Sequence, residues 1–497
     1  MLRTAFLLAL AACGSAPPTP APTPKPVAPA PVAKPTLSGI WLGTLEAGAK
    51  GLRIQIHLDL AATPPTCSLD SLDQGALGIV CNNVVASATE LSFDVPAVHG
   101  GLKGTASPDA NTLTATWTQS GASLPLVLTR QAAAAEATKV AFDPAMPAVE
   151  IEKLQAVLDA DLAKSLAGPL APATGVGVTI GVVQHGVRKV FSYGAVKPDS
   201  VFEIGSITKT FTGLALAQLV EQKKVRLDEP VRALLPKGTV AAPASGAEIT
   251  LLDLSAQRSG LPRLPDNMKP ADDTNPYADY DVKALYAFMA KQGVALPATP
   301  EFGYSNLGVG LLGHALATRA GSTYETLVRK QITEPLGMRD TAITLTPAMA
   351  KRFVPGHGAG NQPQRAWDLN VLAGAGALRS TATDMLGYLE AQLHPDRVKA
   401  RTPEAKTLPA AIAASHQVHA EVTGGMHIAL NWFQIDETKR YWHNGATGGF
   451  SSFAMFDPAQ DFAVIVLCNR SIDDGTLADD LGKHIVQRLT GKPAVSL

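Results

Sequence analysis

The chain has 497 residues, of which 46% are hydrophobic and 17% charged, and its formal net charge at pH 7 is -1. This much apolar material can bury a large core in two or three domains, which excludes an intrinsically disordered protein. A chain so close to neutral has no positive field to attract phosphates, so we expect no nucleic-acid partner.

The amino terminus is typical of an exported protein. Arg3 precedes a short apolar run that ends in small residues, and this pattern predicts a signal peptide over residues 1–12. The run is about half of the roughly 20 residues that a membrane-spanning helix needs, so we predict no permanent transmembrane helix. Leu10-Ala-Ala-Cys13 resembles the lipobox of bacterial lipoproteins. The alternative is an ordinary signal peptide followed by an incidental cysteine.

The lipobox resemblance implies cleavage before Cys13, lipidation of its thiol, and a protein anchored in the bacterial cell envelope, in the periplasm or at the outer membrane. Residues 13–36 are then the lipidated cysteine and a linker rich in Pro and Ala. Such a sequence forms no core and extends like polyproline, which would hold the folded part away from the membrane.

Residues 37–131 are predicted to form a small all-β domain, a sandwich or a barrel. Residues 52–60 alternate apolar and polar side chains without a break, as a strand with one wet face does. Residues 91–95, 112–117 and 124–128 have similar character, with turn residues between them. The segment could bind a ligand, but it holds no cluster of reactive side chains, which favours a docking or spacer role.

The cysteines of an exported chain are candidates for disulfides. A bridge between Cys67 and Cys81 would close a loop of about 15 residues and contribute roughly 3 kcal/mol. Cys468 ends the apolar run 462–468, which predicts a buried, inert thiol rather than the alternative of a catalytic cysteine.

Residues 132–148 are predicted to be a second linker, and residues 149–492 a larger domain. It begins with a strand-like segment at 177–183, continues through several helices, and ends with strands and a helix at 477–489. Strands at both ends with helices between them predict an α+β fold, in which the ends meet in one sheet around a helical insertion.

The first candidate catalytic segment is Phe202-Glu-Ile-Gly-Ser206-Ile-Thr-Lys209. Helical spacing of apolar residues from Phe211 predicts a helix from Ser206 to Leu219. Residues three apart share a helix face, so Lys209 Nζ comes within reach of Ser206 Oγ. The amino end of a helix favours negative charge on that oxygen, and a buried lysine can lose its proton and act as its base. The alternative is that Ser206 merely caps the helix and that Lys209 is solvated.

The second segment is Phe302-Gly-Tyr304-Ser-Asn306, which is followed by a predicted helix over residues 309–320. Tyr304 would offer a phenol for proton transfer, and Asn306 an amide for holding a substrate carbonyl. The alternative is a buried tyrosine whose hydroxyl only satisfies a hydrogen bond.

The third segment is Trp442-His443-Asn-Gly445-Ala446, with more glycines after it. Glycine on an edge strand lets a substrate backbone lie close, and the N–H of Ala446 could form an oxyanion hole with the N–H of Ser206. The alternative is an ordinary glycine-rich hairpin.

Ser-x-x-Lys, Tyr-x-Asn and His-x-Gly, in this order, resemble the three active-site motifs of class C β-lactamases, DD-peptidases and related esterases. Connecting phrases agree with this family over residues 150–490, and they include Leu227-Asp-Glu-Pro230, Arg258-Ser-Gly-Leu-Pro262 and Pro335-Leu-Gly-Met338. The resemblance implies a β-lactamase/transpeptidase-like fold: an antiparallel sheet flanked by helices, an all-helical subdomain, and the site between them.

The same resemblance implies a serine hydrolase that needs no cofactor or metal. Ser206 would be acylated by an amide or ester, namely a peptidoglycan peptide, a small ester or a β-lactam, while Lys209 and Tyr304 transfer protons. Asn306, His443 and Gly445 would bind the substrate. Many β-lactamases have lysine where this chain has His443, so strong β-lactamase activity is not expected. The alternative is a non-catalytic envelope binding protein that retains the fold; the oligomeric state is not predicted.

Three other patterns are disfavoured. Residues 308–313 match a dinucleotide fingerprint in letters, but they follow a loop and lie within a predicted helix. His416 and His419 could place two imidazoles near a zinc ion, but no metalloprotease glutamate motif accompanies them. Gly-x-Ser-x-Gly is absent, which disfavours an α/β-hydrolase.

Overall fold

The computed structural model describes residues 37–45, 52–62, 64–71, 76–98, 100–119, 122–131, 142–399, 402–422, 425–471 and 477–497. The predicted signal peptide, Cys13 and the first linker lie outside these residues, as do residues 132–141 of the second linker. Within the described ranges, no helix has the length and hydrophobicity needed to cross a bilayer.

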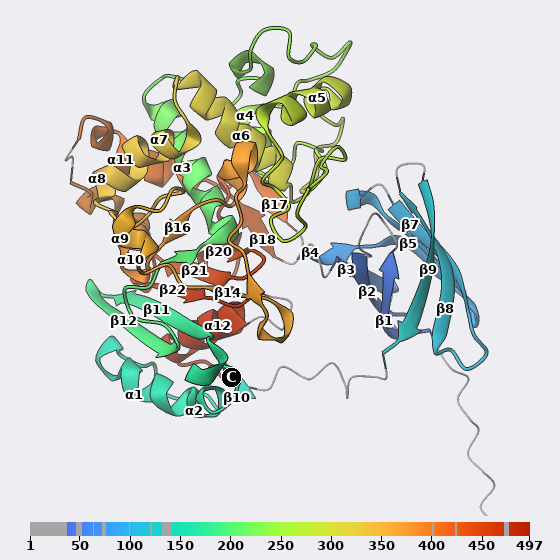
Figure 1. The fold of residues 1–497 in the computed structure, drawn as a ribbon, viewed down its shortest axis with the longest axis horizontal. Helices are drawn as coiled ribbons and strands as arrows, with labels where there is room; N and C mark the ends of the chain where they lie inside the picture. The colour runs from blue at the N-terminus through green and yellow to red at the C-terminus, as the bar shows by residue number, and fades with distance from the viewer. Residues whose placement is uncertain are drawn as a thin grey trace, which may run out of the picture.

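The amino-terminal unit is one antiparallel meander of nine strands, in the order β4-β3-β2-β1-β9-β8-β7-β6-β5 (Figure 1). Side chains alternate along its strands, so that Leu91, Phe93 and Val95 are buried in β6 and enter the same core as Trp41 and Trp117. The sheet curls on itself: β3, near one end of the sheet, contacts β5, the strand at the other end. The predicted all-β domain is confirmed. Its strands are β1 Gly39–Leu45, β2 Leu52–Asp59, β3 Thr66–Ser71, β4 Ala76–Val80, β5 Asn82–Ala86, β6 Glu90–Val95, β7 Gly100–Ala106, β8 Thr112–Gln119 and β9 Ala122–Arg130.

Cys67 and Cys81 lie side by side, at the start of β3 and just after β4. The backbone N–H of Cys81 donates to the carbonyl oxygen of Cys67 over 3.0 Å, and both thiols are buried and free. A hydrogen bond between the two thiols, together with burial, raises the pKa of Cys67. The expected disulfide is therefore not formed in this structure, where the sulfurs share a hydrogen bond instead, and it stays a prediction.

The larger unit is built on an eight-stranded antiparallel sheet in the order β12-β11-β22-β21-β20-β19-β18-β17. The first strand of this sheet, β11, pairs with β22 from the carboxyl end of the unit, as the α+β prediction requires: Val178 lies opposite Cys468. Its strands are β11 Gly177–Gln184, β12 Val187–Gly194, β17 Ala420–Val422, β18 Met426–Ile428, β19 Phe433–Ile435, β20 Tyr441–Ala446, β21 Ser451–Asp457 and β22 Phe462–Cys468.

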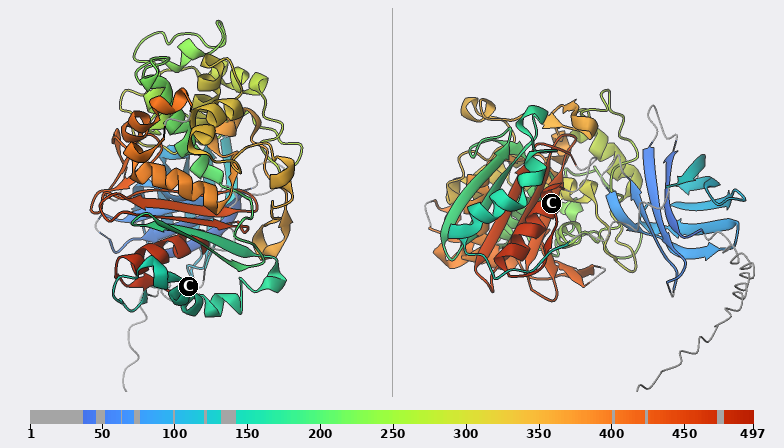
Figure 2. Two further views of the ribbon diagram at one scale, coloured as in Figure 1. Left: turned by 90° about the vertical axis from the view of Figure 1, so that its left-hand side faces the viewer. Right: turned by 90° about the horizontal axis from the view of Figure 1, so that it is seen from below.

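Helices cover both faces of this sheet (Figure 2, left). One face packs against α1 Ile151–Asp161, α2 Ala163–Leu166 and α12 Leu477–Leu489, and the other against α10 Ala382–Leu393. All seven residues of β22 are buried, because its side chains alternate between two separate hydrophobic cores. This explains its unbroken apolar sequence, and Cys468 is buried there as predicted.

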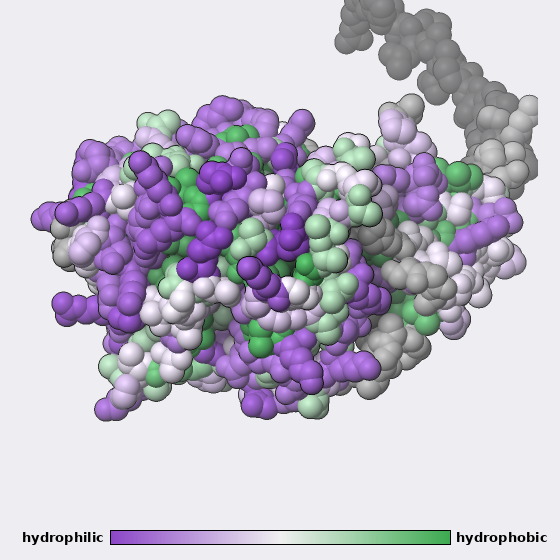
Figure 3. Space-filling view, turned by 90° about the horizontal axis from the view of Figure 1, so that it is seen from above, coloured by the Kyte–Doolittle hydropathy of each residue, from purple (hydrophilic) through white to green (hydrophobic). Residues whose placement is uncertain are grey.

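The helical region is inserted between β12 and β17 and shares the core on the α10 side of the sheet. Its main helices are α3 Thr208–Glu221, α4 Leu251–Ser255, α5 Val282–Gln292, α6 Asn306–Arg319, α7 Tyr324–Val328, α8 Glu334–Leu336, α9 Pro347–Ala350 and α11 Leu408–Ser415. Seen from above relative to Figure 1, the molecule is covered mostly by polar residues, with hydrophobic residues in small scattered patches (Figure 3).

A short strand pair closes the larger unit. β10 Phe142–Asp143 pairs antiparallel with β23 Ala494–Val495. Both strands lie outside the expected bounds of 149–492, since two-residue strands carry no periodicity that a sequence can reveal. The described part of this unit therefore begins and ends at one place in the fold.

Candidate active site

Ser206 lies in a tight turn that leads into the central helix. β13 Phe202–Glu203 is followed by the 3-10 turn η4 Gly205–Ile207, and α3 begins only at Thr208, two residues later than predicted. Gly205 has a φ of 48°, and a Cβ there would lie 2.6 Å from the backbone nitrogen of Ala446. Only glycine fits this turn without strain. The turn presents Ser206 at the amino end of α3, as predicted.

Lys209 is fully buried one turn away and faces Ser206. Its Nζ lies 3.0 Å from Ser206 Oγ, 2.8 Å from Asn306 Oδ1 and 2.7 Å from the carbonyl oxygen of Ala375. Burial, with help from the cation of Arg263, lowers the pKa of Lys209 well below its usual value. A neutral amine donates two hydrogen bonds, which fit the two amide oxygens, and its lone pair then accepts the proton of Ser206.

Tyr304 lies beside both Ser206 and Lys209. Its hydroxyl hydrogen-bonds with Ser206, and Lys209 Nζ lies 4.9 Å from the centre of its ring. Burial raises the pKa of Tyr304, while Arg263 and the hydrogen bond to Ser206 lower it in part. The phenol therefore keeps its proton at rest, next to the reactive oxygen.

Asn306 is the first residue of α6, which begins three residues earlier than expected because Ser305 caps it by accepting from Gly308 N–H at 2.8 Å. While its Oδ1 accepts from Lys209, its side chain also hydrogen-bonds with Tyr277. These two contacts fix the orientation of the amide beside Ser206.

The edge of β20 lies directly against the turn that carries Ser206. A Cβ on Gly445 would lie 2.1 Å from the carbonyl oxygen of Ile204 and 3.0 Å from the backbone nitrogen of Ser206. Ala446 follows, with its backbone nitrogen beside Gly205. The N–H groups of Ser206 and Ala446 are thus neighbours, as an oxyanion hole requires.

His443 is 1% exposed and lies next to the catalytic candidates. Its ring centre is 6.3 Å from that of Tyr304, and its Nδ1 is 2.6 Å from the carbonyl oxygen of Asn444. A carbonyl can only accept, so Nδ1 carries the proton and Nε2 is an acceptor. Burial and the neighbouring Lys209 lower the pKa of His443 to about 3. The imidazole is neutral.

Three residues at the site were not predicted: Arg263, Tyr277 and Trp367. The guanidinium carbon of Arg263 lies 5.1 Å from the ring centre of Tyr304. Tyr277 contacts Asn306, and its ring lies 5.3 Å from that of Trp367. All three come from loops between the motifs. For Arg263, the sequence offered one hint: it directly follows Arg258-Ser-Gly-Leu-Pro262, a segment that resembles the family.

The disfavoured patterns have structural explanations. The imidazole of His416 packs against the rings of Tyr441 and Phe456, and its Nε2 hydrogen-bonds with Gln392, so it serves the packing of the fold. The glycines of residues 308–313 lie within α6, where a Cβ on Gly310 would lie 2.7 Å from Leu372. They serve close helix packing.

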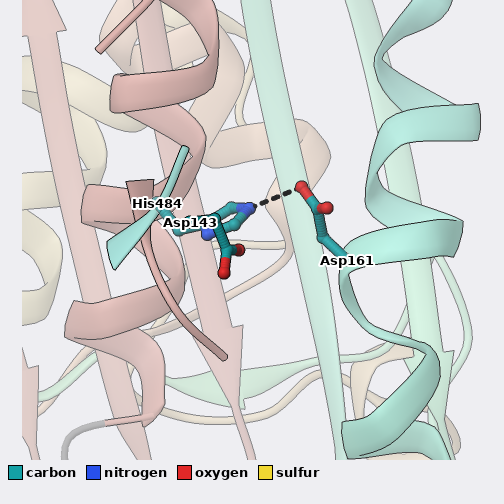
Figure 4. A group of neighbouring side chains, drawn as sticks. All are labelled: Asp143, Asp161 and His484. Carbon is teal, nitrogen blue, oxygen red and sulfur yellow. Dashed lines mark hydrogen bonds and ion pairs between the residues drawn. The ribbon is translucent and has the colours of Figure 1, made fainter. Parts of the chain in front are cut away.

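One cluster among the described residues has the composition of a metal site: Asp143, Asp161 and His484 (Figure 4). His484 Nε2 hydrogen-bonds with Asp161 over 2.8 Å. The guanidinium of Arg488 donates hydrogen bonds to Asp161 over 2.8 Å and to Asp143 over 3.2 Å. A cation thus already bridges both carboxylates. The cluster ties α12 to β10 and to the end of α1.

Comparison with known proteins agrees with this geometry. The β-lactamase family model matches residues 169–487. The D-alanyl-D-alanine-carboxypeptidase/endopeptidase AmpH of Escherichia coli is 30% identical over 321 residues, which cover 60% of this chain and 80% of that protein. A β-lactamase of Pseudomonas fluorescens is 25% identical over 338 residues, 59% of this chain and 88% of that protein.

Solved structures show the same fold. A class C β-lactamase from Rhodobacter sphaeroides superposes with a TM-score of 0.54 at 24% identity and covers 67% of this chain and 96% of its own. A β-lactamase from Sulfitobacter sp. EE-36 gives 0.55 at 25% identity, over 69% of this chain and 97% of its own. The predicted β-lactamase/transpeptidase-like fold is confirmed, and the chain belongs to the β-lactamase family of serine hydrolases.

Proposed function

We propose that this serine hydrolase cleaves the amide bond of a D-alanyl-D-alanine peptide derived from peptidoglycan, through an acyl-enzyme on Ser206. The observation that carries the proposal is the convergence of Ser206, Lys209 and Tyr304, with the lysine buried and its pKa lowered. The similarity to a D-alanyl-D-alanine-carboxypeptidase/endopeptidase supports this substrate class.

Acylation begins with the attack of Ser206 Oγ on the substrate carbonyl carbon, while the hydroxyl proton passes to Lys209 Nζ. The oxygen of the tetrahedral intermediate takes the negative charge and accepts from the N–H groups of Ser206 and Ala446. The phenol of Tyr304 protonates the leaving amine, and the proton on Lys209 restores the phenol. The C–N bond breaks, and the ester on Ser206 remains.

Hydrolysis reverses these transfers. Water loses a proton to the Lys209 and Tyr304 pair and attacks the ester carbonyl, and the released Ser206 oxygen recovers that proton. Asn306 holds the acyl-side amide of the substrate, and the edge of β20 at Gly445 runs beside it.

His443 favours a peptide over a β-lactam as the preferred substrate. A lysine at this position would place a cation beside the substrate, whereas the neutral His443 presents only the acceptor Nε2. We therefore propose that β-lactams acylate Ser206 and are turned over slowly.

The test is covalent labelling followed by intact mass and product analysis. Fluorescent penicillin and a D-Ala-D-Ala peptide should both add their acyl groups at Ser206, and free D-alanine should accumulate with the peptide. Ser206→Ala should abolish both results, whereas Ser322→Ala, a serine on the surface turn before α7, should behave like the wild type. Undiminished labelling of Ser206→Ala would contradict the assignment.

We also propose that the protein acts in the bacterial cell envelope, anchored by lipid on Cys13. The basis is the lipobox-like Leu10-Ala-Ala-Cys13 and the extended linker after it. Wild-type protein should partition into detergent with an acylated amino terminus, and Cys13→Ala should be released in aqueous form. An unmodified Cys13 in mature, membrane-fractionated protein would contradict the proposal.

A further inference from the structure

The backbone at Arg263 is hydrogen-bonded to the residues that directly follow Tyr304. The carbonyl oxygen of Pro262 accepts from Ser305 Oγ over 2.7 Å, and that of Arg263 accepts from Leu307 N–H over 3.1 Å. The backbone around Arg263 is therefore fixed to the start of α6, so that it keeps a constant position relative to Tyr304.

Two basic side chains meet on the ring of Tyr304. The guanidinium carbon of Arg263 lies 5.1 Å from the ring centre, and Lys209 Nζ lies 4.9 Å from it. These distances are within the range of cation–π contact. Arginine stays charged throughout the accessible pH range, whereas a buried lysine can give up its proton. Of the two groups, Arg263 is the fixed cation.

The groups around this pair come from four elements. Lys209 comes from α3, Tyr304 from the loop before α6, Tyr277 from the loop before α5, and His443 from β20. His443 carries no charge. Burial lowers the pKa of Lys209 and raises the pKa of Tyr304 and Tyr277, and the cation of Arg263 lowers all three in part.

We propose that Arg263 is a positioning residue of the hydrolase, whose fixed charge keeps Lys209 neutral and favours loss of the Tyr304 proton. It acts through these two groups rather than on the substrate, and it supplies the positive charge that the neutral His443 does not. This inference rests on the proposed roles of Ser206, Lys209 and Tyr304.

The expected effect has a definite sign. Without the cation, Lys209 keeps its proton to higher pH. The neutral amine of Lys209, which is the proposed base, is then missing over a wider range of acidic pH. The acidic limb of the rate profile reports the ionisation of the catalytic base in the free enzyme. Removing the charge should therefore shift this limb upward, on the order of one pH unit for a cation at this distance.

The test is the rate of labelling by an uncharged fluorophosphonate between pH 5 and pH 10, measured on the full chain. Arg263→Met and Arg263→Gln should both shift the acidic limb upward, whereas Arg263→Lys should retain most of the wild-type profile. Arg226→Met is the matched control, because Arg226 is exposed and pairs only with Asp228 in the described contacts. Its profile should coincide with that of the wild type.

Three outcomes would overturn the inference. One is an unshifted acidic limb in either folded neutral variant, judged folded by its thermal transition. Another is an equal shift in Arg263→Lys. The last is slower labelling by anionic fluorescent penicillin with an unchanged fluorophosphonate profile, which would make Arg263 a substrate-binding group. Failure of the wild type itself to label at Ser206 would instead contradict the proposed function.

Discussion

Lys209 has no exposed surface, and its Nζ is surrounded by oxygens of Ser206, Asn306 and Ala375. Methionine has a similar length but no proton-accepting group. We expect Lys209→Met to lower the rate of Ser206 acylation by about 10²- to 10⁴-fold, the usual contribution of a general base. Stopped-flow labelling with fluorescent penicillin measures this rate.

The matched control for that change is Lys224→Met, an exposed lysine just beyond the end of α3. It should label at the wild-type rate. A Lys209→Met protein that is folded and acylates as fast as the wild type would show that another group removes the Ser206 proton.

At the residue scale, the sequence predicted the contacts that depend on short spacing. Ser206 and Lys209 meet because they are three positions apart at the start of a helix, and Asn306 follows Tyr304 by two positions. Arg263, Tyr277 and Ala375 could not be predicted in the same way. Their approach to the site is set by the packing of loops far apart in the chain.

At the element scale, the approach of β20 to the η4 turn depends on Gly445. A Cβ there would lie 2.1 Å from the carbonyl oxygen of Ile204, so alanine must push the strand away from Ser206. We expect Gly445→Ala to lower kcat/KM by about 10²- to 10³-fold, as loss of an oxyanion-hole donor does. Overpacking should cost about 1–3 kcal/mol of stability.

Gly387→Ala offers the matched control, because this glycine lies within α10 and nothing would lie within 4 Å of its new Cβ. It should keep full activity and gain up to about 1 kcal/mol of stability from better helix propensity. Steady-state kinetics and chemical unfolding check both variants, and an active Gly445→Ala would exclude a tight β20 contact.

A buried carboxyl links α12 to β20. Asp479 accepts from Asn444 Nδ2 over 2.9 Å, and burial raises its pKa to about 6. The unfolded group ionises near its ordinary pKa of 3.8, so this carboxyl weakens the fold increasingly as the pH rises from about 4 to 6. Above that range the cost is constant, on the order of 3 kcal/mol.

Asp479→Asn keeps an acceptor for Asn444 but cannot ionise. Its melting temperature should match that of the wild type near pH 4 and exceed it increasingly up to about pH 6, with a constant difference beyond. Calorimetry over this pH series is the measurement. A difference that does not change with pH would contradict the buried ionisation.

The two neighbouring cysteines at β3 and β4 should respond to oxidation. Cys67 and Cys81 already share a hydrogen bond, so oxidation should join them with little movement and stabilise the β unit by roughly 3 kcal/mol. Under oxidising conditions the denatured protein should take up no alkylating reagent at these positions, while the buried Cys468 remains reactive. Alkylation of both would exclude the bridge.

Element boundaries were predicted least well. The β22 strand and the α12 helix follow unambiguous apolar patterns, and α12 has the predicted bounds. The helix at Ser206 starts later because Gly205 forms a 3-10 turn, and α6 starts earlier because Ser305 caps it. Local hydrogen bonds and backbone strain decide such ends, and hydrophobic spacing does not report them.

At the scale of the whole molecule, the two units have separate cores. The β unit buries Trp41 and Trp117 in its own core, whereas the hydrolase unit buries both faces of its sheet. We expect residues 142–497 alone to fold and to label at Ser206 at the rate of the full chain. A truncated protein that aggregates, or that labels more slowly, would show that the β unit contributes to the hydrolase site.

The pairing of β10 with β23 brings the beginning and the end of the hydrolase unit together. A domain whose ends meet can be inserted as a guest into a surface loop of a host protein with little distortion of either. The unit is thus suited to serve as a transplantable reporter: spliced into a host loop whose two splice points lie close together, it would label at Ser206 while the host keeps its own fold.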